Sequence, residues 1–171
     1  MTNLVFGKWG GCPGMKYEDG ELVLESCPVY RENIDYPDIV AELDGRFLPD
    51  TTADVAYWAV NIRKVDFGHG YTLRIWYDGQ VDLEGFGEGG GPIPRAANPG
   101  LQSNHLLLVA KGTRFAFYVN DQPLTYLEDD TNRWGTIMFV LPTGYEYTFG
   151  EPVIVAFDNF KLWDISDIGI P

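Results

Sequence analysis

Hydrophobic and polar residues alternate with a period of two in several segments of this chain. Between residues 39 and 47, small or apolar residues hold the odd positions and mostly polar residues the even ones. The same alternation recurs in residues 56–63, 71–77 and 81–84, and short alternating segments fill residues 104–164. Successive side chains of a strand point to opposite faces, so this pattern predicts an all-β protein, a two-sheet antiparallel jelly-roll sandwich. The side chains expected in the core of the second half are Leu106, Leu108, Phe117, Val119 and Phe157.

Turn signals separate the alternating segments. Asp78-Gly79 is the strongest hairpin signal, Asn120-Asp121 predicts a second tight turn, and a hairpin is expected around Asp19-Gly20. Residues 85–100 are rich in Gly and Pro and show no apolar period, so they predict a loop within the domain. No segment sustains a period of 3.6 residues, which predicts few or no helices. A chain of 171 residues suits one domain, expected to span residues 1–171.

Several short motifs of the chain occur together in one known family. They are Asn104–Gly112, Tyr118–Asp121, Asp129-Asp130 before Gly135, and Phe157–Asn159, with Tyr17–Gly20 and Tyr77–Gly79 fitting upstream. In these motifs the chain resembles bacterial concanavalin A-like lectin/glucanase (laminin-G-like) jelly-roll modules. Two departures are Asp121 in place of a Gly, and Ile137–Phe139 in place of a more glycine-rich strand. The resemblance implies the fold and favours carbohydrate as a partner, but lectins and glycoside hydrolases share this fold, so it fixes no function.

The net charge of −13 narrows the classes of partner. So acidic a chain repels phosphate backbones, which excludes nucleic acid as an expected partner, and anionic membranes are disfavoured for the same reason. No apolar run is long enough for membrane insertion. The charge suits solubility, cation binding or a neutral partner such as a polysaccharide.

Cys12 and Cys27 lie at nearly equal distances from the expected hairpin at Asp19-Gly20. The hairpin would bring them together, and we predict a disulfide between them; the alternative is two unpaired thiols. A bridge closing such a loop stabilises by roughly 3 kcal/mol and implies an oxidising compartment. The N-terminal residues show no basic segment followed by an apolar run, so an exported protein would have lost its leader.

Parity along two expected strands predicts a binding face. If Trp58 and its alternating neighbours face the core, then Asn61 and Arg63 face outwards, and Arg74 and Trp76 follow on the next strand. The Asp78-Gly79 hairpin brings Asp82 near Trp76. An indole, guanidinium groups and an amide on one open face can stack on a sugar ring and bond its hydroxyls. The predicted ligand-binding residues are Asn61, Arg63, Arg74, Trp76 and Asp82. The alternative is that Trp76 packs beneath the loop of residues 85–100.

Catalytic and metal-binding alternatives have weaker support. Asp82 and Glu84 share a face, and retaining glycosidases use two carboxylates about 5–5.5 Å apart, but no third acidic residue accompanies this pair. His105 has no Ser or Cys nucleophile pattern beside it. Oxygen ligands for calcium are available at Asp129, Asp130, Asp158 and Asn159. For Asp158 and Asn159, hydrogen bonds that fix a strand end are the favoured interpretation, and the sequence predicts no catalytic residue, metal ligand or cofactor.

The sequence therefore favours a non-catalytic carbohydrate-binding or adhesion module with a glycan ligand, outside the cell or on its surface. A cytoplasmic location stays open as the alternative. The second interpretation is a structural protein-interaction or assembly domain of a larger surface protein, which a large flat apolar outer face would favour. The third is a glycoside hydrolase-like enzyme, which a carboxylate pair in a deep groove would favour.

Overall fold

The computed structural model describes residues 2–3, 9–10, 13–27, 29–31, 37–51, 56–64, 70–87, 90–142 and 152–169. This part of the chain is built of strands and connecting turns and contains no α-helix, as the alternation predicts. The strands are β1 (Thr2–Asn3), β2 (Trp9–Gly10), β3 (Met15–Glu18), β4 (Glu21–Glu25), β5 (Val29–Arg31), β6 (Ile39–Phe47), β7 (Tyr57–Lys64), β8 (Tyr71–Trp76), β9 (Val81–Glu84), β10 (Gly91–Ile93), β11 (Asn104–Lys111), β12 (Arg114–Val119), β13 (Gln122–Glu128), β14 (Thr136–Val140) and β15 (Ile154–Asp164).

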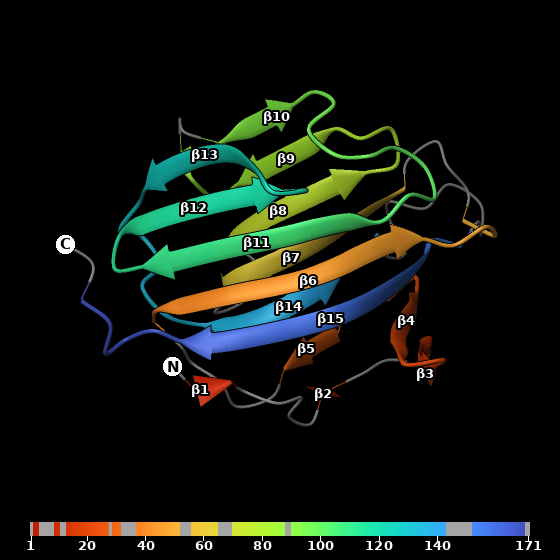
Figure 1. The fold of residues 1–171 in the computed structure, drawn as a ribbon, viewed down its shortest axis with the longest axis horizontal. Coiled ribbons are helices and arrows are strands. Elements are labelled where there is room, and N and C mark those ends of the chain that lie inside the picture. The colour runs from red at the N-terminus through yellow and green to blue at the C-terminus, as the bar shows by residue number, and fades with distance from the viewer. Residues whose placement is uncertain are drawn as a thin grey trace.

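The strands form two sheets that pack face to face (Figure 1). Sheet A has the order β13-β12-β11-β6-β15-β4-β3, with β1 also paired to β15, and sheet B has the order β10-β9-β8-β7-β14-β5-β2. Neighbouring strands run antiparallel throughout. The predicted two-sheet antiparallel jelly-roll sandwich is confirmed. No helix long and apolar enough to cross a membrane occurs in the described residues.

The core lies between the sheets and consists of the inward side chains that the alternation selects. β6, β8 and β11 alternate strictly between buried and half-buried residues. All five predicted core residues are confirmed, each at most 2% exposed. Burying side chains of this size contributes roughly 1.5–3 kcal/mol each, so the inner faces of the two sheets supply most of the driving force for folding.

Gly45 shows how tightly the two sheets meet. It is an inward position of β6, and a Cβ atom there would lie 2.8 Å from the indole of Trp58 on β7. Trp58 is fully buried and packs edge-on against Phe157 of β15, with ring centroids 5.5 Å apart. Gly45 is therefore needed for space, because any side chain would displace a buried indole.

The predicted tight turns are confirmed by their backbone angles. Asp19 and Gly20 have φ values of 51° and 92°, and Asn120 and Asp121 have 51° and 63°. Two successive positive φ values match the twist of the flanking strands, and Asn, Asp and Gly adopt them at the least cost. Asp121 therefore stands in place of the Gly of the modules that the chain resembles, without loss of the turn.

A β-bulge interrupts β15 within the Phe157–Asn159 motif. The pairing register of β15 with β6 shifts between Asp158 and Lys161, and Asn159 has a φ of 53°. As a result Phe157 and Phe160 both pack into the core, whereas Asp158 and Asn159 are exposed on the outer face of sheet A. Bulges of this kind re-aim side chains within a strand.

Two expectations need comment. The segment 85–100 is not entirely loop, because β10 pairs with β9 and extends sheet B. The sequence does not predict β10 because a strand of three residues is too short to show alternation, and Gly91 and Pro92 are poor strand formers. Cys12 lies outside the described residues, so its bridge to Cys27, which is buried, stays a prediction. The extent of the domain over residues 1–171 also stays a prediction.

Candidate functional site

The outer face of sheet B carries the predicted cluster on β7, β8 and β9. Trp76 pairs with Tyr57 of β7, and Arg74 pairs with Ala59 on one side and with Asp82 of β9 on the other. The intervening residues of all three strands are buried in the core. Asn61, Arg74, Trp76 and Asp82 therefore share the side of the sheet that parity predicts.

Trp76 is half-buried and held in place by its neighbours. Its indole N–H donates to Oδ2 of Asp82 at 2.6 Å, and the amide of Gln80 donates to Oδ1 of the same carboxylate at 2.9 Å. Its ring lies 5.0 Å from that of Tyr57, tilted by 59°. The predicted proximity of Asp82 and Trp76 is confirmed, and the indole is fixed rather than free to rotate.

Arg74 lies beside these two rings. Its guanidinium bonds to Glu84 of β9 and is 5.1 Å from the ring centroid of Tyr57, an attractive cation–π arrangement. The side chain of Arg74 is 26% exposed and that of Glu84 62%. The face thus combines the half-buried Trp76 ring and the buried Tyr57 ring with one cation and two carboxylates. Arg74 is paired with Glu84, and Asp82 accepts hydrogen bonds from two neutral donors, Trp76 and Gln80.

Asn61 lies on the same side of the sheet but is only 7% exposed. Its Oδ1 atom is buried and has no hydrogen-bond partner. An unsatisfied buried acceptor costs roughly 1–3 kcal/mol. The prediction of Asn61 as an open surface residue is therefore wrong, because both faces of β7 are buried over most of its length.

Arg63 does not join this face, and its predicted position there is wrong. Its φ of 50° and the register shift of β14 against β7 break the alternation at this residue. The side chain turns into the end of the sandwich, where it is fully buried and lies 4.9 Å from the ring centroid of Phe115. A bulge of this kind leaves no mark in the hydrophobic pattern, so parity could not reveal it.

The Arg63 guanidinium is bonded to three backbone carbonyl groups and one carboxylate. Nε donates to Pro37 O at 3.0 Å, and Nη1 donates to Gly112 O at 2.7 Å and to Asn132 O at 3.1 Å. Nη2 donates to Pro37 O at 2.5 Å and lies 3.6 Å from Oδ1 of Asp38. These contacts tie together segments far apart in sequence, so Arg63 has a structural role and is not available to a ligand.

Asp38 is the carboxylate at the end of the sandwich where Arg63 is buried, and it contacts both Arg63 and Lys111. Burial alone raises the pKa of Asp38, but the hydrogen bonds from the Gly112 N–H and the Lys111 ammonium, with the charges of Lys111 and Arg63, outweigh it and lower the pKa overall. The Lys111 ammonium lies 2.8 Å from Oδ2 of Asp38 and donates to two carbonyl groups near the C-terminal end of β15. The end of the sandwich therefore depends on an ionised Asp38.

Of the other sequence candidates, His105, Asp129 and Asn159 take part in structural hydrogen bonds. Nδ1 of His105 lies 2.8 Å from Oδ1 of Asp44, whose Oδ2 accepts from the Asn159 amide at 2.7 Å. Tyr71 donates to Asp129, and burial followed by this bond raises the pKa of Tyr71 to about 12. Within the described residues, no three His, Cys, Asp or Glu side chains come together as a metal site.

Comparison with known proteins gives the fold independently. No protein-family model and no curated protein matches the sequence. Among solved structures, the chain is similar to a β-glucanase of Bacillus licheniformis, with a TM-score of 0.69, 12% identity and 90% of each chain covered. It is also similar to the carbohydrate-binding module CBM66 of Bacillus subtilis, with a TM-score of 0.58, 19% identity and coverage of 93% of this chain and 92% of that one.

A Bacillus subtilis protein of unknown function with a galectin-like fold is similar over 92% of this chain and 88% of its own, with a TM-score of 0.63 and 10% identity. The fold is a concanavalin-like jelly roll. This confirms the resemblance carried by the sequence motifs. At such low identity the likeness shows the fold alone, and the site has to be argued from this chain's own residues.

Proposed function

We propose that this protein is a non-catalytic carbohydrate-binding module whose ligand contacts the outer face of β8 and β9, beside the covered strand β7. The observation that carries the proposal is Trp76, a half-buried indole fixed by Asp82 and flanked by Tyr57 and Arg74. An amphipathic aromatic side chain that is partly exposed on a sheet face suits contact with the apolar side of a sugar ring. Two of the similar structures, a β-glucanase and a carbohydrate-binding module, are carbohydrate proteins by name, which supports the choice of ligand class.

The surrounding polar groups supply hydrogen bonds to hydroxyl groups. Arg74 and Glu84, and Asp82 with Gln80, offer donors and acceptors near the indole. A net charge of −13 disfavours strongly anionic ligands and leaves neutral glycans as the preferred class. Binding should be weak, because few groups contribute and they remain open to water.

The carboxylates of this face favour binding over catalysis. Both oxygen atoms of Asp82 accept hydrogen bonds, from Trp76 and from Gln80, and Glu84 is paired with Arg74. A glycosidase needs one carboxyl group as a proton donor and a second as a base or nucleophile beside the scissile bond. Carboxylates used to hold an indole and a guanidinium are poorly placed for these roles. A protein of this kind acts outside the cell or on its surface, and we include that location in the proposal.

The test is a panel of neutral polysaccharides in affinity gel electrophoresis, with and without calcium, on the wild type and two variants. Trp76→Ala should weaken binding by roughly tenfold or more, the loss expected when a central aromatic contact is removed. Trp134→Ala is the matched control, because Trp134 is 53% exposed but lies outside this face. It should bind as the wild type does.

Three outcomes would contradict the proposal. One is equal affinity of the folded Trp76→Ala variant and the wild type. Another is release of reducing sugar from a bound polysaccharide that stops in Asp82→Asn, which would favour the glycoside hydrolase. The third is binding to no glycan of the panel, which would favour the protein-interaction domain.

A further inference from the structure

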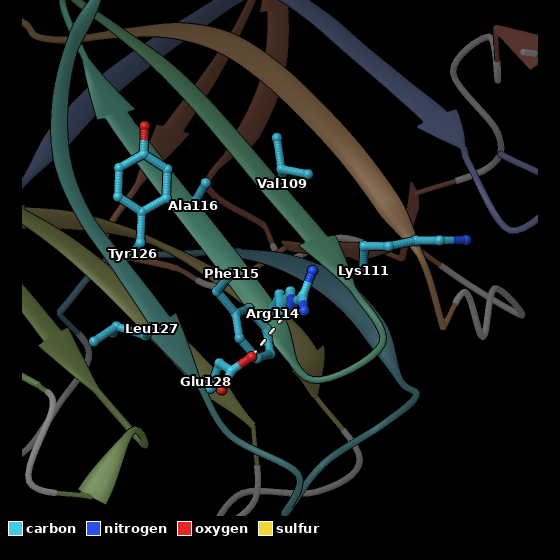
Figure 2. A pocket seen from close by; sticks show the side chains of 8 residues that line it. All are labelled: Val109, Lys111, Arg114, Phe115, Ala116, Tyr126, Leu127 and Glu128. Atoms are coloured by element: carbon cyan, nitrogen blue, oxygen red, sulfur yellow. Dashed lines mark hydrogen bonds and ion pairs between the residues drawn. The ribbon is translucent and has the colours of Figure 1, made fainter. Parts of the chain in front are cut away.

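The outer face of sheet A, opposite the face proposed above, contains a hollow of about 310 Å³ between β11, β12 and β13 (Figure 2). Its lining residues are Val109, Lys111, Arg114, Phe115, Ala116, Tyr126, Leu127 and Glu128. The cause of the hollow is Ala116. This residue lies between Val109 and Tyr126 in the cross-strand register, and its neighbours on the same face of β12 are the much larger Arg114 and Tyr118. A methyl group in that position leaves a depression bounded by bulky side chains.

Tyr126 forms an aromatic wall of this hollow. It is 67% exposed although it belongs to a strand, whereas most of the aromatic rings whose burial the structure describes lie in the core. Its hydroxyl group lies 2.9 Å from that of Tyr118, and the two rings meet edge to face with centroids 6.2 Å apart. The exposed ring is thus held in one orientation, which lowers the entropy cost of binding something against it.

The polar rim of the hollow is electrically balanced. Nε of Arg114 donates to Oε1 of Glu128 at 3.2 Å, and both side chains are about two-thirds exposed at 67% and 70%. Lys111, the other cation, is directed away and paired with Asp38, as Figure 2 and its hydrogen bonds show. The rim therefore presents donors and acceptors without an uncompensated charge that would select an ion.

From these features we propose that the hollow is a second carbohydrate site, which takes one neutral pyranose unit of a glycan. The apolar floor of Val109 and Ala116 and the ring of Tyr126 would contact the C–H face of the sugar. Arg114 and Glu128 would bond its hydroxyl groups from the rim. An ionic ligand gains nothing from the paired charges, and a pocket of this size with an apolar floor and a few polar groups suits a small amphipathic molecule.

This site does not depend on the first site, on the outer face of β8 and β9. The two lie on opposite sides of the sandwich, because the core separates the outward residues of sheet A from those of sheet B. A molecule with both sites would be bivalent toward a polysaccharide, and its apparent affinity for a long chain would exceed that of either site alone.

The test uses Trp76→Ala as the starting protein, so that the first site is removed and only the hollow is measured. Methyl β-D-glucopyranoside, methyl β-D-galactopyranoside and methyl α-D-mannopyranoside are titrated in turn, and amide chemical shifts are followed by NMR. At least one sugar should shift the resonances of Ala116, Tyr126 and Glu128 saturably, with a dissociation constant in the millimolar range expected for one sugar unit on an open surface.

Two variants then remove the site in different ways. Tyr126→Ala takes away the aromatic wall, and Ala116→Leu fills the floor while keeping Tyr126; each should weaken binding roughly tenfold or more. Ala116 is half-buried on an outer face, so the larger side chain can be accommodated without disturbing the core. Tyr17→Ala is the matched control, since Tyr17 is 57% exposed elsewhere on sheet A, and it should leave binding unchanged.

The proposal is overturned if no sugar shifts these resonances, or if binding persists in folded Ala116→Leu. Sedimentation velocity of the wild type tests the alternative occupant of the hollow, a second copy of the chain. A dimer that dissociates in Ala116→Leu, without any sugar binding, would assign the hollow to a second copy of the chain and would equally overturn the proposal.

Discussion

Replacing Arg63 by methionine should destabilise the protein by about 3–5 kcal/mol, the cost of breaking a buried ion pair by removing one partner. The side chain is completely buried, so no solvent replaces the lost donors. Carbonyl oxygens of Pro37, Gly112 and Asn132 would lose their hydrogen bonds, and each orphaned buried acceptor costs roughly 1–3 kcal/mol before the structure relaxes. Asp38 keeps its bonds with Lys111 and Gly112, which limits the total.

Arg74→Met is the matched control. It removes the same group from the neighbouring strand, but Arg74 is 26% exposed and its partner Glu84 is largely in water. Pairs of this kind contribute about 0–1 kcal/mol. The free energy of unfolding is measured for both variants by urea denaturation, with tryptophan fluorescence and circular dichroism as independent probes. The slopes of the transitions should match the wild type, because neither change alters the surface exposed on unfolding.

The reasoning would be refuted if Arg63→Met cost no more than Arg74→Met. A wild-type stability for Arg63→Lys would also contradict it, because an ammonium group cannot reproduce the planar fork that reaches three carbonyl groups at once. Loss of glycan binding in a stable, folded Arg63→Met protein would indicate that Arg63 contacts the ligand after all.

Two further predictions concern the core and the response to acid. Gly45→Ala should cost about 1–3 kcal/mol by forcing Trp58 from its position, whereas Gly169→Ala, with open space around it, should be neutral; thermal and urea denaturation compare them, and equal stabilities would contradict the packing at Gly45. The pKa of Asp38 is lowered on folding, so its contribution is present above its unfolded value of about 3.9 and is lost as the pH falls through the folded value. Unfolding free energies measured from pH 7 down to pH 2 should therefore fall less steeply in Asp38→Asn than in the wild type, and identical slopes would show that Asp38 is not coupled to folding.

The hydrophobic pattern predicts most of this fold because one face of each strand is buried. Strict alternation assigns Leu106 and Leu108 to the core and Arg74 and Trp76 to the outer face. The hairpin at Asp78-Gly79, whose connecting loop is residues 77–79, fixes the register that brings Asp82 beside Trp76. These are local consequences of parity and turn geometry, which the sequence carries directly.

Parity fails where the backbone departs from regular strand geometry. Arg63 has a positive φ that turns its side chain inwards. The residue type does not predict this conformation, because Arg rarely adopts a positive φ. Asn61 is buried although it lies on the predicted side, because alternation cannot show what covers an outer face.

The hollow beside Tyr126 depends on cross-strand register. Ala116 and Tyr126 become neighbours only when β12 and β13 pair, and a bulge between Phe117 and Tyr118 alters that pairing. The one available signal was a small residue, Ala116, at an outward position between two large ones. Such a residue is common on sheet surfaces, and it indicates a site only when the partner strand is known.

The central claim, glycan binding on the outer face of sheet B, is tested most directly by the indole N–H resonances of the tryptophans during titration with a polysaccharide fragment that binds. Trp76 donates its N–H to Asp82, so its resonance should shift saturably as the ligand contacts this face. Trp58 is fully buried and serves as the internal reference, with no shift expected. A saturable titration of other resonances that leaves the Trp76 indole unmoved would contradict the account.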